Sequence, residues 1–496
     1  MRIRQEIAKR FSFGRSVLVR LRCWCVLVLS CAIVFCTPSR AQTFVDIYNF
    51  TTNNSSQLPY APLTQGRNGA LYSTAHGQGD YGSVIKVTTA GFFDQIFPFD
   101  YTNGSNPLAG LVLAANGNFY GVTASGGANG DGTLFKISSG GYTILHSFAG
   151  GSDGITPRGA PIQAADGNIY GTTEGNLGVS GATVYKYTPA GGVSTIYQFD
   201  TTTEILASLV QGSDGNLYGS AYGGGSNACG VLFKLTTGGT LLWSYSFPCG
   251  TGGSSPAAPL VQAADGNFYG TTEQGGSAGD GTVFKMTAKG KVSILYSFQS
   301  GSDGANPDAG LAQATDGMLY GATTGGGIEG FGTLFQISTA GAYKSLYSFT
   351  STSGEYPEAG LIQHTDGTLY GTAYKGGANA LGSVYSLNMG LGPFITFVRP
   401  MGRVGSTAQI LGQGLTGTTT VAFNGIATTS FTVVSDTYMT AAVPSGATTG
   451  AVVVTTASGT LTSNKNFQIV GGATTPTRSK SGPLVSHATN RKKTTN

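Results

Sequence analysis

One tyrosine recurs seven times along the chain, each time after an apolar residue and a glycine-containing turn. The spacings are 48, 50, 48, 51, 51 and 50 residues, and the tyrosines are Tyr72, Tyr120, Tyr170, Tyr218, Tyr269, Tyr320 and Tyr370. Self-similarity at a fixed period of this length is typical of repeat architectures, in which each unit buries its apolar faces against its neighbours. The sequence therefore predicts seven copies of one small structural unit.

Each copy contains four short strand-like segments, which are clearest in residues 259–298. The segments read PLVQA, FYGTT, GTVFKM and VSILYSF, and the turns ADGN and TAKGK separate the first from the second and the third from the fourth. Asp-Gly and Asn-Gly supply the positive φ angles of tight hairpins, so the repeated aspartates are interpreted as turn formers. Lysines that recur in the third segment are interpreted as solvated rim residues. We name the segments a, b, c and d.

Four antiparallel strands per repeat match the blade of a β-propeller, and a solenoid is the competing architecture. Seven d segments exist, but the first precedes the first repeat and the last repeat lacks its own. Residues 45–50 would then complete the last blade beside residues 382–387 and close a ring. A different phase, with each blade running d-a-b-c, needs no such closure. We favour the closed ring because the d-to-a connector carries a proline in six of seven cases, which suits a crossing from an outer to an inner strand.

The repeated DGNxYG and GGxxxxGTxFK patterns resemble the GloVer (Gloeo/Verruco) tandem-repeat proteins, a bacterial extracytoplasmic family. The resemblance covers residues 44–390. It implies secretion or surface exposure and no defined reaction.

The first 41 residues resemble an export signal. Basic residues precede an apolar run from Trp24 to Cys36, and Ser39-Arg40-Ala41 fits the small-x-small cleavage rule. We expect a Sec-type signal peptide cut near Ala41 and a secreted, extracellular or cell-surface protein. An apolar run of about 13 residues is short for a membrane span, which needs about 20. No later segment is apolar enough to span, so no transmembrane span is expected.

The formal net charge of +4 is misleading because the first 41 residues hold eight Lys or Arg and one acid. Residues 42–391 contain 11 Lys or Arg against 21 Asp or Glu. An acidic main domain without a basic patch makes nucleic acid an unfavoured partner.

The repeat stops near Gly392, where a different pattern of about seven short strands begins. Residues 392–471 are similar to the IPT/TIG domain, an immunoglobulin-like β-sandwich that serves bacterial surface proteins as a spacer or interaction module. The matching positions are Pro400, Gly405, Gly412, Val421, Phe423, Asn424, Gly425, Val443 and Pro444. Residues 472–496 form a basic tail that cannot bury a core and is expected to be disordered. The predicted fold is all-β: a seven-bladed β-propeller over 42–391 followed by this sandwich.

Two of the six cysteines, Cys229 and Cys249, lie after the signal. Cys229 is in the b-to-c loop of the fourth repeat and Cys249 follows its d segment, so antiparallel pairing of c and d brings them together and predicts a disulfide. Two free thiols are the alternative. No histidine accompanies them, so a zinc site is not favoured. Asp131 and Asp280 stand in loops similar to calcium-binding nonapeptides, but those loops are blades apart, so we expect no metal and no cofactor.

One position varies while its neighbours repeat: the residue four places after the repeat tyrosine, at the exit of segment b. This exit set is His76, Ala124, Glu174, Tyr222, Glu273, Thr324 and Tyr374. Its members would form a ring on one face of the propeller, where tyrosines and carboxylates are suited to bind a sugar. We take His76, Glu174, Tyr222, Glu273 and Tyr374 as candidate ligand-binding residues. Free variation of surface loop positions is the alternative.

No catalytic motif stands in a supporting context, so no catalytic residue is assigned. We expect a non-enzymatic extracellular binding or scaffold protein whose propeller face engages a glycan, cell-wall or protein partner. A polysaccharide lyase or glycoside hydrolase using Glu174, Glu273 or His76 is the first alternative. A structural surface protein without a small ligand is the second.

Overall fold

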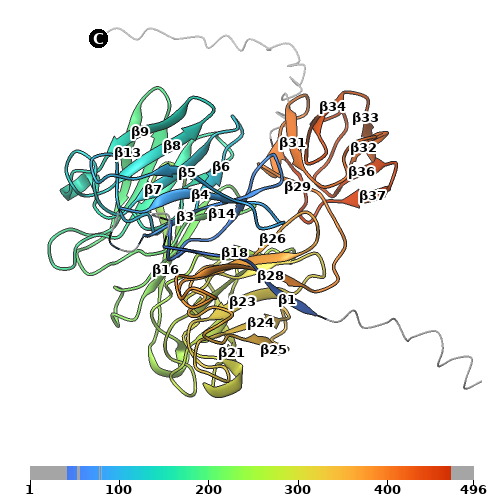
Figure 1. Cartoon of the computed structure of the whole chain (residues 1–496). Coiled ribbons are helices and arrows are strands. Elements are labelled where there is room, and N and C mark those ends of the chain that lie inside the picture. Colours follow the sequence, from blue (N-terminus) through green and yellow to red (C-terminus); the bar gives the residue numbers. More distant parts are fainter. Residues whose placement is uncertain (1–41, 53–55, 78, 80, 471–496) are drawn as a thin grey trace, which may run out of the picture.

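The computed structural model describes residues 42–470 except 53–55, 78 and 80. The signal peptide and the basic tail predicted from the sequence therefore lie outside the described residues. The described chain forms seven four-stranded antiparallel blades, followed by two four-stranded sheets and one two-stranded sheet at the C-terminal end (Figure 1). No helix among the described residues is long and apolar enough to cross a bilayer.

Blades 1 to 6 are built from consecutive strands. Blades 1 and 2 are formed by β2 (Thr64–Gln65), β3 (Leu71–Ala75), β4 (Ser83–Val87) and β5 (Phe93–Pro98), and by β6 (Val112–Leu113), β7 (Phe119–Thr123), β8 (Thr133–Ser138) and β9 (Gly141–Ser147). Blades 3 and 4 are formed by β10 (Ile162–Gln163), β11 (Ile169–Thr173), β12 (Thr183–Thr188) and β13 (Gly192–Gln198), and by β14 (Val210–Gln211), β15 (Leu217–Ala221), β16 (Val231–Leu235) and β17 (Leu241–Ser246). Blades 5 and 6 are formed by β18 (Val261–Gln262), β19 (Phe268–Thr272), β20 (Thr282–Met286) and β21 (Val292–Ser297), and by β22 (Ala312–Gln313), β23 (Leu319–Thr323), β24 (Thr333–Ile337) and β25 (Tyr343–Ser348). Blades 2, 4 and 5 are each followed by a single 3₁₀ turn: η1 (Gly151–Asp153), η2 (Gly250–Gly252) and η3 (Gly301–Asp303).

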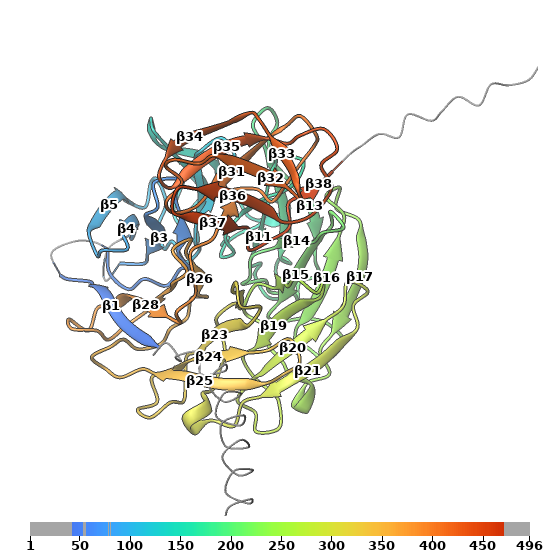
Figure 2. The ribbon, with the colours of Figure 1, turned by 90° about the vertical axis from the view of Figure 1, so that its right-hand side faces the viewer.

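Blade 7 is closed by the start of the described chain, as the sequence predicted. Its strands are β26 (Ile362–Gln363), β27 (Leu369–Ala373), β28 (Ser383–Asn388) and, on the outside, β1 (Thr43–Asn49). Strand β1 pairs antiparallel with β28 from Thr43 opposite Asn388 to Asn49 opposite Ser383 (Figure 2). The Phe44 ring stacks on Tyr347 with centroids 3.8 Å apart. The blade phase is therefore a-b-c-d, with segment d of the last blade supplied by β1.

Adjacent blades are joined by aromatic rings. In most blades, the phenylalanine directly after strand d packs edge-on against an aromatic ring in strand c of the following blade. Phe298 meets Phe335 at 5.3 Å and Phe247 meets Phe284 at 5.4 Å. All four rings are completely buried. Because these rings are buried in the contact between two blades, a single blade cannot bury them fully, and this explains why the repeats stack around a ring.

A ring of glutamines links the short first strands of neighbouring blades. In six of the seven junctions a glutamine side-chain oxygen accepts a hydrogen bond, 2.7 to 3.1 Å long, from a backbone N–H in the a-to-b turn of the preceding blade. The acceptors are Gln65, Gln163, Gln211, Gln262, Gln313 and Gln363. Leu113 stands at the seventh position.

The repeated aspartates form the a-to-b turns and also bind the side chains of the repeat tyrosine and the recurring lysine. In blade 5, Asp265 accepts a backbone hydrogen bond from Asn267 at 3.0 Å, the Tyr269 hydroxyl donates to it at 2.7 Å, and Lys285 Nζ lies 3.0 Å away. Blade 4 repeats this arrangement with Asp214. The recurring lysine, interpreted from the sequence as a solvated rim residue, is thus paired with the turn aspartate in these two blades. Antiparallel pairing of b and c places it directly opposite the repeat tyrosine.

This arrangement predicts an acid-dependent loss of stability. Burial raises the pKa of Asp214 and of Asp265, but hydrogen bonds, among them those from the paired lysine and tyrosine, outweigh it and hold each pKa at about 2. Because the pKa of each aspartate is lower in the folded protein than its value near 4 in the unfolded chain, the charged carboxylate stabilises the fold at pH values above 4. This contribution to the free energy of unfolding is lost as the pH falls toward 2. In urea unfolding, Asp214→Asn with Asp265→Asn should cost about 1 kcal/mol per site at neutral pH.

The cost should shrink toward zero in acid, where the wild-type carboxylates are protonated too. Glu329→Gln, at an exposed loop position, is the matched control and should leave stability unchanged. A deficit of the double variant that stays constant down to pH 2 would contradict the assignment of the charged carboxylates as the stabilising groups.

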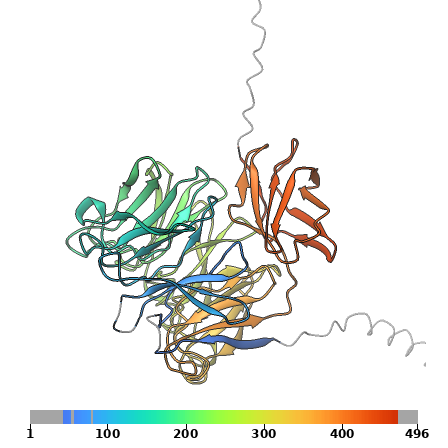
Figure 3. The ribbon, with the colours of Figure 1, turned by 45° about the horizontal axis from the view of Figure 1, so that its top comes forward.

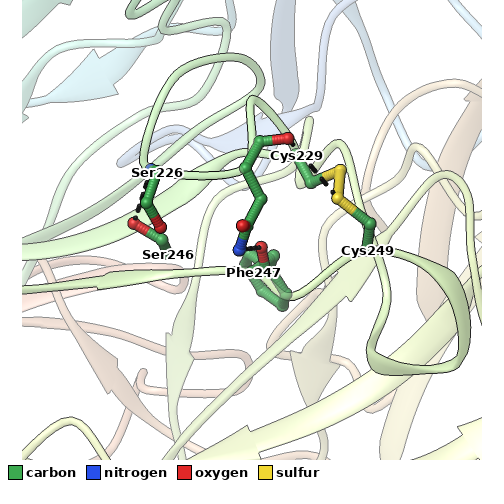
Figure 4. The surroundings of a disulfide bond; sticks show 6 residues. Ser226, Cys229, Ser246, Phe247 and Cys249 are labelled. Atoms are coloured by element: carbon green, nitrogen blue, oxygen red, sulfur yellow. Dashed lines mark hydrogen bonds between the residues drawn. A yellow bond between two sulfur atoms is a disulfide. The ribbon is translucent and has the colours of Figure 1, made fainter.

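Blade 4 contains the predicted disulfide. Cys229, before β16, is bonded to Cys249, after β17, with Cα atoms 5.5 Å apart (Figure 4). Beside it, Asn227 donates to the Phe247 carbonyl at 3.0 Å, and the Ser226 N–H donates to the Ser246 hydroxyl at 3.2 Å. The bond fastens the b-to-c loop to the end of the outer strand.

The C-terminal sheets enclose a separate core. One sheet has the order β29 (Thr396–Phe397), β31 (Thr407–Leu411), β35 (Tyr438–Ala442) and β34 (Phe431–Ser435), and the other has β33 (Ile426–Thr428), β32 (Thr420–Phe423), β36 (Val452–Thr456) and β37 (Gly459–Thr462). A parallel pair, β30 (Met401–Gly402) with β38 (Gln468–Ile469), completes the unit. Figure 3 shows this unit in orange and red beside the blades. Buried residues from both four-stranded sheets, such as Ile410 and Val454, belong to one hydrophobic cluster.

The C-terminal unit docks where the glutamine ring is interrupted. Arg67, in the a-to-b turn of blade 1, donates to the Ala115 carbonyl at 2.9 Å and to Gln409 Oε1 at 2.7 Å, and its guanidinium lies 4.6 Å from the centroid of the Tyr438 ring. Thr437 donates to the Arg67 carbonyl at 2.7 Å. Since a-to-b turns lie at the opposite end of strand a from the d-to-a connectors, this unit covers the face away from those connectors.

Candidate functional site

The d-to-a connectors of all seven blades meet around one cavity of about 350 Å³. Each connector contributes the residue that follows its proline, or follows Ile205 in blade 4. We call these residues the connector set: Tyr60, Leu108, Arg158, Leu206, Ala257, Asp308 and Glu358. One residue from every blade lines the cavity, so it lies at the centre of the ring.

The exit set lies directly beside the connector set. In every blade the N–H of the exit residue donates to the carbonyl of the residue two places before the connector residue, for example Glu174 to Thr156 at 3.1 Å and Tyr374 to Tyr356 at 3.1 Å. In six blades that carbonyl residue has a positive φ although it is not glycine, as at Thr156 with φ 52°. Such a conformation is unfavourable for a β-branched residue and is held here by the pairing.

The structure brings four of the five sequence-predicted residues to this cavity or its edge. Tyr222 and Glu273 line it. Glu174 lies beside Arg158 of the lining, with Oε1 3.5 Å from Nη1. The Tyr374 ring meets the Tyr60 ring edge-on at 5.8 Å. His76 is not among the lining residues, and its Nδ1 lies 2.8 Å from the Gly77 carbonyl oxygen.

The connector set was not identified from the sequence, although its signal is present there. The connector prolines marked the crossing between blades, and the residue after each proline varies from tyrosine to arginine to aspartate while the proline repeats. The same contrast between a varying position and repeating neighbours identified the exit set.

Carboxyl groups dominate the polar part of the cavity. Burial, reinforced by the nearby charges of Glu273 and Glu358, raises the pKa of Asp308 to about 8. Burial also raises the pKa of Glu358, although a hydrogen bond from Tyr60 and the charges of Lys375 and Arg158 oppose this. At neutral pH the Asp308 carboxyl is therefore mostly protonated and able to donate a hydrogen bond.

Another carboxyl, that of Glu174, lies at the edge of the cavity, next to the carboxyl of Glu204. Burial raises the pKa of Glu174 to about 7, Arg158 opposes the shift, and a hydrogen bond with Glu204 adds to it. A carboxyl with such a pKa could exchange a proton with a bound molecule near neutral pH.

The described residues contain no group of three His, Cys, Asp or Glu side chains placed to hold a metal ion. The aspartates of the two calcium-like loops, Asp131 and Asp280, are accordingly not part of such a group. The lining instead combines carboxyls, one arginine and tyrosines with apolar walls from alanine, leucine and proline. This mixture is suited to an organic ligand.

The fold and its central cavity define a seven-bladed propeller repeat protein. The family model described as the Gloeobacter/Verrucomicrobia repeat matches residues 30–207, 159–385 and 206–439. The chain belongs to this family, in agreement with the resemblance seen in the repeats. No curated protein matches it in sequence.

Several solved propeller structures are similar to this chain. A gluconolactonase from Xanthomonas campestris shares 11% identity at a TM-score of 0.38, over 71% of this chain and 90% of the other. Putative 6-phosphogluconolactonases from Bacteroides fragilis and Bacteroides uniformis share 16% and 14% identity at TM-scores of 0.45 and 0.42. They cover 66% and 67% of this chain and 90% and 88% of their own.

Proposed function

We propose that this is a secreted or cell-surface binding protein that holds a glycan or cell-wall component at its central cavity. The observation that carries the proposal is the connector set, because all seven blades contribute one varied residue to one cavity on a scaffold that otherwise repeats. Tyrosine rings offer flat apolar surfaces, and carboxyls accept hydrogen bonds from hydroxyls, as sugar binding requires.

The remaining parts fit the same proposal. Export through a signal peptide cut near Ala41 agrees with the Cys229–Cys249 bond, since disulfides persist in oxidising compartments. We propose that the C-terminal sheets form an immunoglobulin-like domain of the IPT/TIG type that acts as a spacer or docking module. It leaves the connector face open, because it docks on the opposite side of the ring.

A polysaccharide lyase or glycoside hydrolase is the second candidate, and one observation favours it. The pKa values of Glu174 and Asp308, at about 7 and about 8, lie in the range in which a carboxyl can act as a general acid. His76 is no longer required for this alternative, since it does not line the cavity.

An array of glycans and cell-wall fragments separates the candidates when both retention and product formation are scored. If the protein only binds, it should be retained on the array without forming products. The double variant Tyr60→Ala with Tyr222→Ala should then be retained at least about tenfold less. Tyr81→Ala with Tyr101→Ala is the matched control, because both rings are about half exposed and neither lines the cavity. Product formation abolished by Glu174→Gln or Asp308→Asn would instead establish the enzyme. Retention equal in all variants would contradict binding at this cavity.

A further inference from the structure

The cavity holds more carboxyl groups than cationic partners. Glu273, Asp308 and Glu358 line it together with one cation, Arg158. The ion-pair partner of Arg158 is Glu174, which is outside the lining. Over the described part of the chain, no lysine or arginine forms an ion pair with any of the three lining carboxyls. An anionic ligand would therefore be repelled, and a cation would be attracted.

Asp308 supplies a second, independent observation. Its Oδ1 is buried and has no hydrogen-bond partner among the described residues, while Oδ2 has only the Thr324 hydroxyl at 3.4 Å. Buried polar atoms nearly always have a partner in folded proteins, and leaving one unpaired is costly. A hydrogen-bond donor on a bound ligand would supply the partner that Asp308 Oδ1 lacks.

The tyrosine rings at the cavity indicate which kind of cation it would bind. Tyr60 and Tyr222 line the cavity, and Tyr374 meets Tyr60 at its edge. Lys375 already places its own ammonium group 5.4 Å from the Tyr374 ring centroid, so the rim accommodates an alkylammonium on a tyrosine face. Tyrosine faces attract organic cations, and a primary ammonium brings three hydrogen-bond donors. A divalent metal fits less well, because the described carboxyls are not grouped to coordinate one.

We propose that the ligand places a primary ammonium group in the cavity against Asp308, between Glu273 and Glu358. The chemical class is an organic amine, either an amino sugar or an alkylamine. The inference rests on the proposed binding at this cavity and specifies which group of the ligand enters it.

Ammonium binding should be coupled to proton release. The groups that face Asp308 are the carboxyls of Glu273 and Glu358 and the hydroxyl of Thr324, with Tyr60, Tyr222 and Arg158 around them. A cation placed beside Asp308 favours its charged form and lowers its pKa, so a carboxyl that is protonated at neutral pH loses its proton. Titration calorimetry in two buffers of different ionisation enthalpy measures that proton.

The test compares four probes on the full mature chain: glucosamine, N-acetylglucosamine, glucose and n-butylamine. The proposal predicts that glucosamine binds at least about tenfold more tightly than N-acetylglucosamine or glucose, and that its binding releases a proton. Binding by n-butylamine as well would show that the amine alone suffices, whereas its absence would assign the site to amino sugars. Asp308→Asn should remove the preference for the amine, and Glu329→Gln, a matched loss of an exposed carboxylate, should preserve it.

The outcomes separate this inference from the proposed function. If glucose or N-acetylglucosamine binds as tightly as glucosamine, the cavity binds sugars and the ammonium inference is wrong. If no probe binds and the array shows no retention, both are wrong. Circular dichroism of Asp308→Asn reports whether that variant remains folded, and Glu273→Gln with Glu358→Gln provides a second variant that should weaken amine binding by the same mechanism.

Discussion

A chain that begins at residue 51 is expected to lose the closed ring, because it lacks the outer strand of blade 7. Six residue pairs join β1 to β28, and the rings of Phe44 and Tyr48 stack on Tyr347 and Phe93. Phe50 is completely buried, and removing a buried phenylalanine side chain alone costs about 3 to 5 kcal/mol. That is a large share of the roughly 5 to 15 kcal/mol that stabilises a folded domain.

The measurement is thermal unfolding together with size-exclusion chromatography of the purified chain. The truncated chain should melt without a cooperative transition or should associate through the exposed edge of β28. The matched control begins at residue 42 and should fold as the full mature protein does. Phe50→Ala gives a graded version of the same test. An unchanged melting temperature after removal of residues 42–50 would contradict closure by this strand.

Removal of the disulfide is expected to destabilise the protein by about 3 kcal/mol, since the bond closes a loop across a sequence separation of 20 residues. The reason is that an unfolded chain with this loop open has more conformations available to it. Cys229→Ser with Cys249→Ser, measured by urea unfolding of the chain from residue 42, tests the value. These are the only two cysteines after residue 41, so the variant has no other thiol.

Reductant supplies the control for this measurement. The wild-type protein in reductant should fall to the stability of the double variant, and the double variant should not respond. A double variant as stable as the oxidised protein would show that the hydrogen bonds of Asn227 and Ser226 fasten the loop without the disulfide.

The blades could be predicted from the sequence because their determinants are local and repeated. Asp265 and Gly266 form a turn within four residues, and Tyr269 reaches back to the same aspartate, so the pattern is visible in one repeat and confirmed by its copies. The disulfide followed from the same local logic, since the c and d strands of one blade are joined by a short turn.

The docking of the C-terminal unit could not be predicted in this way. Arg67 contacts Gln409, which is 342 residues away, and neither residue belongs to a repeated pattern. The candidate site was half predicted: Tyr222 and Glu273 came from the exit set, whereas Asp308 and Glu358 did not. Recognising them requires knowing that the residue after the connector proline points to the centre of the ring, and the sequence reports only that the position varies.

The pairing of β1 with β28 has a consequence for the order in which the molecule can fold. Asn49 accepts a hydrogen bond from the N–H of Ala378, and these residues are separated by 329 positions in the chain. During synthesis β1 is made before the rest of the propeller and must wait for its partner β28 until nearly the whole propeller has been made. Contacts between such distant residues slow folding, and until they form, the edge of blade 7 remains open to pairing with a second chain. The joining of the two ends of the propeller is therefore the step at which we expect folding to be slowest and most sensitive to protein concentration.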